Sequence, residues 1–128
     1  SNRSIIRLIP TFGERTAMSD KHPLPTDIVL NQKDKILRVT FEGDTLFELS
    51  CEYLRVFSPS AENLIAQEDG TWLTGKGDVN IKQIDPIGNY AVRLTFDDGH
   101  KTGVYSWQWL YELGVYEKEK WAEYQKHI

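Results

Sequence analysis

Apolar and polar residues alternate along two segments of the chain, 36–42 and 90–96, with a period of two residues. This period is typical of a strand that buries one face and exposes the other. A polar turn follows each segment, and the segments 45–49 and 101–105 are expected to return as antiparallel partners. The pattern therefore predicts two β-hairpins.

Each predicted hairpin is followed by a serine, Ser50 in the first case and Ser106 in the second. Serine is a common N-cap because its side chain accepts a hydrogen bond from the first turn of a helix. Short helices are therefore expected at 50–56 and 106–113, and Gly114 is expected to be a left-handed C-cap.

The rest of the pattern is less regular. Two further strands are expected at 27–30 and 79–84, where short apolar segments lie between polar turns. Prolines and glycines punctuate the segment 58–78, which is predicted to be an irregular loop.

The two hairpin-and-helix segments resemble each other. Residues 37–42 match residues 92–97 at a spacing of 55, and the spacing becomes 56 after the turns. The similarity is either an internal duplication or a common local solution reached twice. In both cases the predicted fold is a β-rich α+β domain of antiparallel hairpins with two short helices, in two ββα-like units.

The length of 128 residues fits one domain. We expect residues 1–22 to be a flexible arm, in which the part before Met18 is either not native or a targeting peptide. Residues 23–116 are expected to form the domain. The tail, 117–128, mixes charges with aromatic residues and is predicted to be an amphipathic helix.

Composition excludes several classes of function. A net charge of -4 opposes non-specific binding of nucleic acid. No apolar segment approaches the roughly 18 residues of a membrane-spanning helix. The single cysteine, Cys51, excludes an internal disulfide, and its expected role is that of a small buried residue. The expected compartment is the cytoplasm.

His100 is the strongest candidate for chemistry, because it lies in a turn beside Asp97 and Asp98. These carboxylates could raise the pKa of the imidazole or share a metal ion with it. The alternative is an ordinary solvated side chain. The neighbours of His22 and His100 do not form the histidine and carboxylate pattern of an oxygenase iron site. No catalytic motif is present, so we expect neither an enzyme nor a cofactor.

Aromatic residues crowd the second predicted helix, at Trp107, Trp109 and Tyr111. Exposed Trp and Tyr are common anchors of protein interfaces, so these three residues are candidates for binding a partner. The alternative is that one face of the helix is core and the other packs under the C-terminal tail.

Several longer motifs resemble a known family: residues 53–56 with 58–62, then 88–100, then 102–114. The chain resembles the bacterial domain of unknown function, DUF971, that is similar to the N-terminal domain of γ-butyrobetaine hydroxylase. The resemblance covers about residues 24–114, and no activity is assigned to stand-alone members.

The resemblance has implications for metal binding and for partners. In the hydroxylases this domain holds a structural zinc through three cysteines and one histidine. The corresponding positions here are Ser58, Ser60, Asn63 and His100, so the resemblance implies no zinc. A similar domain is fused to some iron–sulfur cluster carrier ATPases of the Mrp type, which implies an accessory role near cluster assembly.

Two hypotheses for function follow. The first is a non-enzymatic accessory or protein-interaction domain that presents the helix around 107–111 and the loop 58–78 to a metalloenzyme or a cluster-assembly factor. The alternative is a small-molecule or metal-binding domain centred on Asp97, Asp98 and His100. The sequence leaves the oligomeric state and the partner open.

Overall fold

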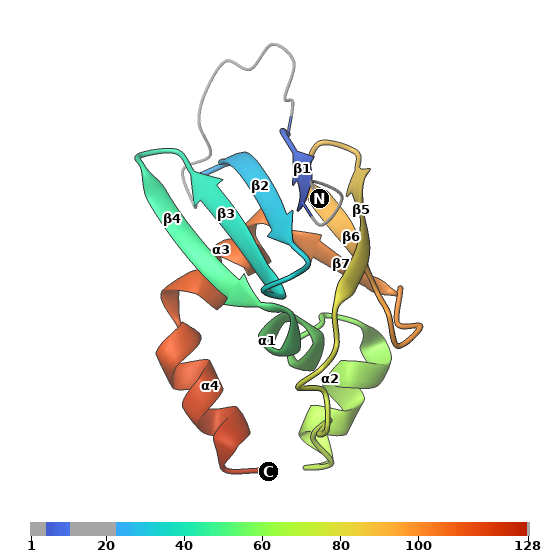
Figure 1. The fold of residues 1–128 in the computed structure, drawn as a ribbon. Helices are drawn as coiled ribbons and strands as arrows, with labels where there is room; N and C mark the ends of the chain where they lie inside the picture. Colours follow the sequence, from blue (N-terminus) through green and yellow to red (C-terminus); the bar gives the residue numbers. More distant parts are fainter. Residues whose placement is uncertain (1–4, 11–22, 128) are drawn as a thin grey trace.

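Two antiparallel β-sheets and four helices make up the parts of the chain that the computed structural model describes, residues 5–10 and 23–127 (Figure 1). One sheet has the order β1-β2-β3-β4, with β1 Ile5–Leu8, β2 Pro25–Asn31, β3 Ile36–Phe41 and β4 Thr45–Ser50. The other has the order β5-β6-β7, with β5 Ile81–Ile87, β6 Ala91–Phe96 and β7 Gly103–Ser106. The helices are α1 Cys51–Val56, α2 Ala61–Glu68, α3 Trp107–Val115 and α4 Glu117–Gln125. The predicted α+β fold is confirmed.

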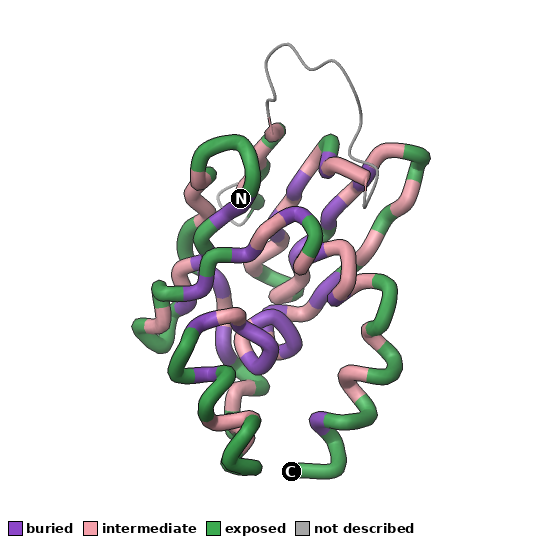
Figure 2. Tube along the Cα trace, turned by 180° about the vertical axis from the view of Figure 1, so that it is seen from behind, coloured by how far each residue is buried: buried purple, intermediate pink, exposed green. Residues whose placement is uncertain are grey.

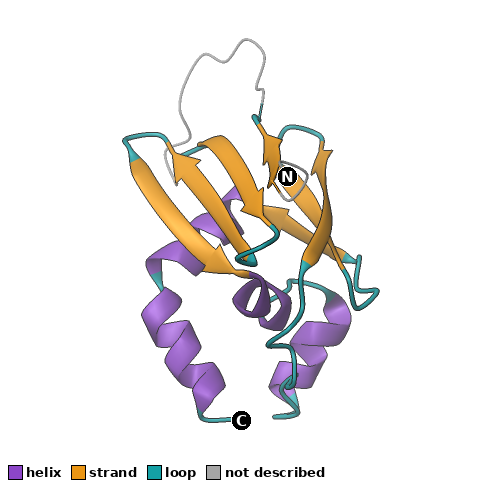
Figure 3. Cartoon of the chain, in the orientation of Figure 1, coloured by secondary structure: helices purple, strands orange, loops and turns teal. Residues whose placement is uncertain are grey.

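The two predicted ββα units are present as β3-β4-α1 and β6-β7-α3 (Figure 3). In the first unit Ser50 Oγ accepts a hydrogen bond from the Tyr53 amide at 3.1 Å. In the second unit Ser106 Oγ accepts one from the Trp109 amide, also at 3.1 Å. Both predicted N-caps are therefore confirmed, and each helix starts where its serine satisfies a free amide.

The period of two decides which strand residues are buried. Val39 of β3 and Leu94 of β6 have no exposed surface, whereas their neighbours Arg38 and Arg93 are exposed. Tyr90 was expected to share the buried face of its strand, but β6 begins one residue later and Tyr90 is 58% exposed.

The core is shared by both sheets and all but one of the helices. The helix α1 lies between α2 and α4, and most of its residues are buried (Figures 1 and 2). Tyr53 of α1 packs edge-to-face against Trp121 of α4, with ring centroids 6.1 Å apart. Tyr124 of α4 is 1% exposed, so the predicted helical tail is docked on the core. None of the helices in the described parts of the chain is long and apolar enough to span a membrane.

An edge strand, β1, occupies part of the segment predicted to be a flexible arm. Its residues pair antiparallel with β2, and Arg7 makes a two-pronged ion pair with Asp27 at 2.9 and 3.0 Å. The prediction of a flexible arm does not hold for these residues. Met18 and the rest of the predicted arm, apart from residues 5–10, lie outside the described residues.

The segment 58–78 contains the helix α2, which the sequence pattern did not predict. Its apolar residues Leu64 and Ile65 face solvent, at 47% and 59% exposure, so they do not form the buried stripe of an amphipathic helix. The strand β5 also continues through Pro86, which was expected to lie in a connecting turn.

Gly114 is not the C-cap of α3. The helix continues to Val115 and its C-cap is Tyr116. A Cβ atom at Gly114 would lie 2.3 Å from the ring of Phe47, so this glycine permits close packing of the helix on β4.

Candidate functional site

Ser58 and His100 meet in a buried polar cluster where the segment after α1 approaches the β6–β7 turn. Ser58 Oγ lies 2.8 Å from His100 Nε2. The serine has no exposed surface, and a Cβ atom at Gly103 would lie 2.5 Å from its hydroxyl. The nearby Tyr105 hydroxyl donates to the Leu54 carbonyl. The structure therefore brings together two of the four positions that the resemblance assigned to zinc ligands.

The other two positions are buried but do not share in this contact. Asn63 Nδ2 donates to the Val56 carbonyl at 2.6 Å, which ties α2 to the end of α1. Ser60 Oγ is buried and has no hydrogen-bond partner among the described residues. Within those residues no three His, Cys, Asp or Glu side chains come together as a metal site.

Asp98 is held by two cations rather than facing a ligand. Its Oδ2 atom lies 2.8 Å from Arg55 Nε and 2.8 Å from Lys76 Nζ, and its Oδ1 accepts from the His100 amide at 3.0 Å. Burial favours a higher pKa, but the hydrogen bonds from Lys76, the His100 amide and Arg55 hold the pKa of Asp98 well below its ordinary value. Asp97 Oδ1 accepts from the amide of Asn80 at 3.0 Å. These contacts stabilise the turn, and they give no support to a metal or small-molecule site there.

The pKa of His100 is lowered, first by burial and then by the positive charge of Arg55. Glu62 and Asp98 act in the opposite direction but do not outweigh these effects. The net lowering is opposite to the expected rise, although the carboxylate of Asp98 acts in the expected direction. The imidazole of His100 is neutral at neutral pH.

In space, Ser58, His100 and Glu62 lie in the same order as the nucleophile, base and acid of a catalytic triad. However, His100 Nδ1 lies 3.8 Å from Glu62 Oε1, which is too long for a hydrogen bond. The hydroxyl of Ser58 is also closed to solvent. In this arrangement the serine cannot reach a substrate, so the cluster is a hydrogen-bonded support for the fold.

The predicted aromatic surface on α3 is mostly covered. Trp107 is 4% exposed and its Nε1 donates to the Asn89 carbonyl, so Trp107 belongs to the core and is not a surface anchor. Trp109 is half-buried beneath α4, with Lys120 Nζ 4.9 Å from its ring centroid. Tyr111 is half-buried and packs edge-to-face on Phe41. The arrangement matches the alternative in which one face is core and the other packs under the tail.

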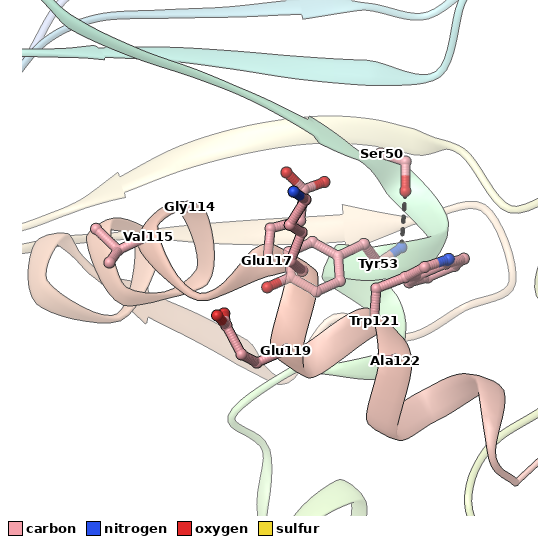
Figure 4. Close-up of a pocket in the computed structure, with 9 residues that line it drawn as sticks. Ser50, Tyr53, Gly114, Val115, Glu117, Glu119, Trp121 and Ala122 are labelled. Atoms are coloured by element: carbon pink, nitrogen blue, oxygen red, sulfur yellow. Dashed lines mark hydrogen bonds between the residues drawn. The ribbon is translucent and has the colours of Figure 1, made fainter.

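A groove that sequence reasoning missed lies where α1, α3 and α4 meet (Figure 4). Its volume is about 550 Å³, and its lining includes Tyr53, Val115, Glu117, Glu119 and Trp121. It joins α1 to residues more than 60 positions later in the chain, so no local pattern shows it. The only signal in the sequence was the presence of aromatic residues among the charges of the tail.

The groove is both aromatic and acidic. The Tyr53 hydroxyl donates to the Leu113 carbonyl at 2.6 Å. Burial raises the pKa of Tyr53, and the charges of Glu117 and Glu119 raise it further. Burial also raises the pKa of Glu117. Neither carboxylate has an ion pair or a hydrogen bond with any other residue that the structure describes.

These features define a small α+β domain whose buried polar groups serve mainly its own hydrogen bonds. The model of the family described as γ-butyrobetaine hydroxylase-like, N-terminal, matches residues 28–111, and the chain belongs to this family.

Solved structures agree with this assignment. A protein of unknown function of the DUF971 family from Acidithiobacillus ferrooxidans, known from a crystal structure, is 31% identical to the chain, with a TM-score of 0.63. That similarity covers 75% of this chain and 98% of the other. A protein with an NMR solution structure is 42% identical, with a TM-score of 0.70, over 88% of this chain and 84% of the other. None of the curated proteins matches the chain.

Proposed function

We propose that this protein is a non-enzymatic accessory domain of the cytoplasm that acts by binding another protein, either a metalloenzyme or a factor of iron–sulfur cluster assembly. Membership of a family of unknown function supports no more specific activity. The kind of partner follows from the resemblance to domains fused to cluster carrier ATPases, and rests on that association.

The observation that carries the proposal is the inverted polarity of α2. This helix buries its polar residue Asn63 and exposes the aliphatic residues Leu64 and Ile65. Gln67 Nε2 joins Asn63 in donating to the Val56 carbonyl, so hydrogen bonds fix this orientation of the helix. Two adjacent exposed aliphatic side chains on a fixed helix form a surface that association with a protein would bury.

The test is direct binding between the full chain and a purified cluster carrier ATPase of the Mrp type from the same genome, measured by calorimetry. The double variant Leu64→Asp and Ile65→Asp is expected to weaken the complex at least about tenfold, because charge opposes burial of this surface. Leu46→Asp is the matched control, since Leu46 is 50% exposed on β4 and lies outside α2.

Three outcomes contradict the proposal. The first is the absence of any complex with the carrier ATPase and with a 2-oxoglutarate oxygenase tested in the same way. The second is a complex that the α2 variant leaves unchanged. The third is equal weakening by Leu46→Asp, which would show that any added charge has the same effect.

A further inference from the structure

The groove beside α4 has a lining suited to a cation on an apolar stem. We propose that it binds a lysine or arginine side chain presented by a short basic segment of a partner protein. This groove is separate from the exposed surface of α2, and the proposal does not depend on what α2 binds.

The apolar surface of the groove, from Trp121 and Val115, suits the stem of such a residue. Trp121, which is half-buried, offers an aromatic face to the groove, and its ring lies at 73° to the buried ring of Tyr53 (Figure 4). Val115, which is 45% exposed, adds an aliphatic edge. Long basic side chains bury their methylene groups on such surfaces and keep the charged end near carboxylates or aromatic faces.

Charge determines which kind of side chain enters. Glu117 and Glu119 line the groove and have no cation partner among the described residues. Both carboxylates raise the pKa of Tyr53 through their negative charge. The partly buried carboxylate of Glu117 has lost hydration, and a bound cation would compensate for that loss.

Lys118 places a positive charge on the lining of the same groove. The residue is exposed and makes no ion pair with any other described residue. Removing its ammonium group leaves the two glutamates with a higher net negative charge. Lys118→Ala is therefore expected to strengthen the binding of a basic segment rather than weaken it.

The groove is built largely from residues beyond the part of the chain that defines the family. The family model ends at residue 111, whereas Gly114, Val115 and the α4 residues of the groove come later. The inferred binding is therefore a property of this chain and of relatives that carry an equivalent of α4.

The experiment is an NMR titration of the isotope-labelled full chain with the peptide acetyl-Leu-Lys-Leu-Lys-amide at low salt. Saturable shifts are expected at Tyr53, Ala122 and the Trp121 indole. Replacing both groove carboxylates, with Glu117→Gln and Glu119→Gln, is expected to weaken binding at least about tenfold. The rest of the spectrum shows whether each variant is folded.

The matched control is Glu123→Gln, because Glu123 lies on the same helix and pairs with Lys126 and His127 outside the groove. This variant is expected to bind the peptide as the wild type does. Equal binding of acetyl-Leu-Glu-Leu-Glu-amide, or binding unchanged in the double glutamine variant, would overturn the proposal. Shifts that do not saturate would do the same. Equally strong binding of ethylammonium would overturn the choice of a protein segment as the occupant.

Discussion

Gly114 of α3 lies against the ring of Phe47 of β4. The three nearest atoms to a Cβ placed there all belong to the Phe47 ring, at 2.3 to 2.6 Å. That ring cannot easily move aside, because it packs edge-to-face against both Phe41 and Tyr111. A single methyl group would therefore push α3 away from the sheet.

We predict that Gly114→Ala destabilises the protein by about 1–3 kcal/mol, although alanine favours helix formation more than glycine does. Urea denaturation followed by tryptophan fluorescence measures this free energy. Gly77→Ala is the control, because the nearest atom to its Cβ would be 4.0 Å away. Equal stability of Gly114→Ala and the wild type would contradict the packing argument.

His100 makes the stability of the fold depend on pH. The pKa of its imidazole is lower in the folded protein than the ordinary 6.5. Between these two values the unfolded chain binds more protons than the folded one, so acidification favours unfolding. The contribution of His100 is complete above about pH 6.5 and is lost as the pH falls through the lowered pKa.

The free energy of unfolding is therefore predicted to decrease from about pH 7 to pH 5, and to decrease less in His100→Gln, which does not titrate. Urea denaturation at each pH measures both curves. The range from pH 7 to pH 5 is chosen because Asp98 and Glu62 also have lowered pKa values. Protonation of these two carboxylates destabilises the fold only at lower pH. Parallel curves for the two proteins in this window would show that His100 is not the group responsible.

At the scale of the element, local signals predicted the parts that depend on neighbours in sequence. The alternation in β3 and β6 and the capping serines Ser50 and Ser106 determined two hairpins and two helix starts. The strand β1 carries no such signal, since it is held by pairing with residues of β2 that lie at least 20 positions later in the chain.

The helix α2 was missed for a different physical reason. Helix prediction relies on a buried apolar stripe, but Leu64 and Ile65 of α2 face solvent while Asn63 faces the core. Only the resemblance to the zinc-binding hydroxylase domain indicated that Ser58 and His100 lie close together. The 42 positions that separate these residues in the chain make their proximity a consequence of the fold.

The resemblance implies that Ser58, Ser60, Asn63 and His100 correspond to the zinc ligands of the hydroxylase domain. Substitution can test this correspondence. Ser58, Ser60 and Asn63 are all buried, and Ser58 already contacts His100. We predict that the variant with Ser58→Cys, Ser60→Cys and Asn63→Cys binds one Zn²⁺ per chain with His100 as the fourth ligand.

Co²⁺ is the probe for this variant, because tetrahedral thiolate coordination gives it strong visible absorption bands. His100→Ala in the same background is the control, and is expected to weaken binding or change the spectrum. Absence of the bands would show that the three positions do not converge on one metal ion.

At the scale of the whole molecule, α4 forms most of the C-terminal tail, and a few side chains hold it on the core. Tyr124 is buried, and its hydroxyl donates to Glu52 at 3.2 Å. Trp121 packs on Tyr53, and the imidazole of His127 stacks on Trp72 at 4.7 Å between centroids. A nine-residue helix is marginal alone in water, so these contacts hold α4 in place.

Tyr124→Ala is predicted to release α4 while both sheets stay folded, because the helix loses its one fully buried anchor and the strands keep their own pairing. Amide hydrogen exchange followed by NMR measures this. Protection is expected to be lost in residues 117–125 and kept in β3 and β6, whereas the control Gln125→Ala, at an exposed position, is expected to keep both. Equal loss in the strands would show that α4 and the sheets unfold as one unit.

If only α4 is released, Trp121 and the two groove glutamates leave Tyr53 with it, and the binding of a basic peptide is expected to disappear from an otherwise folded protein.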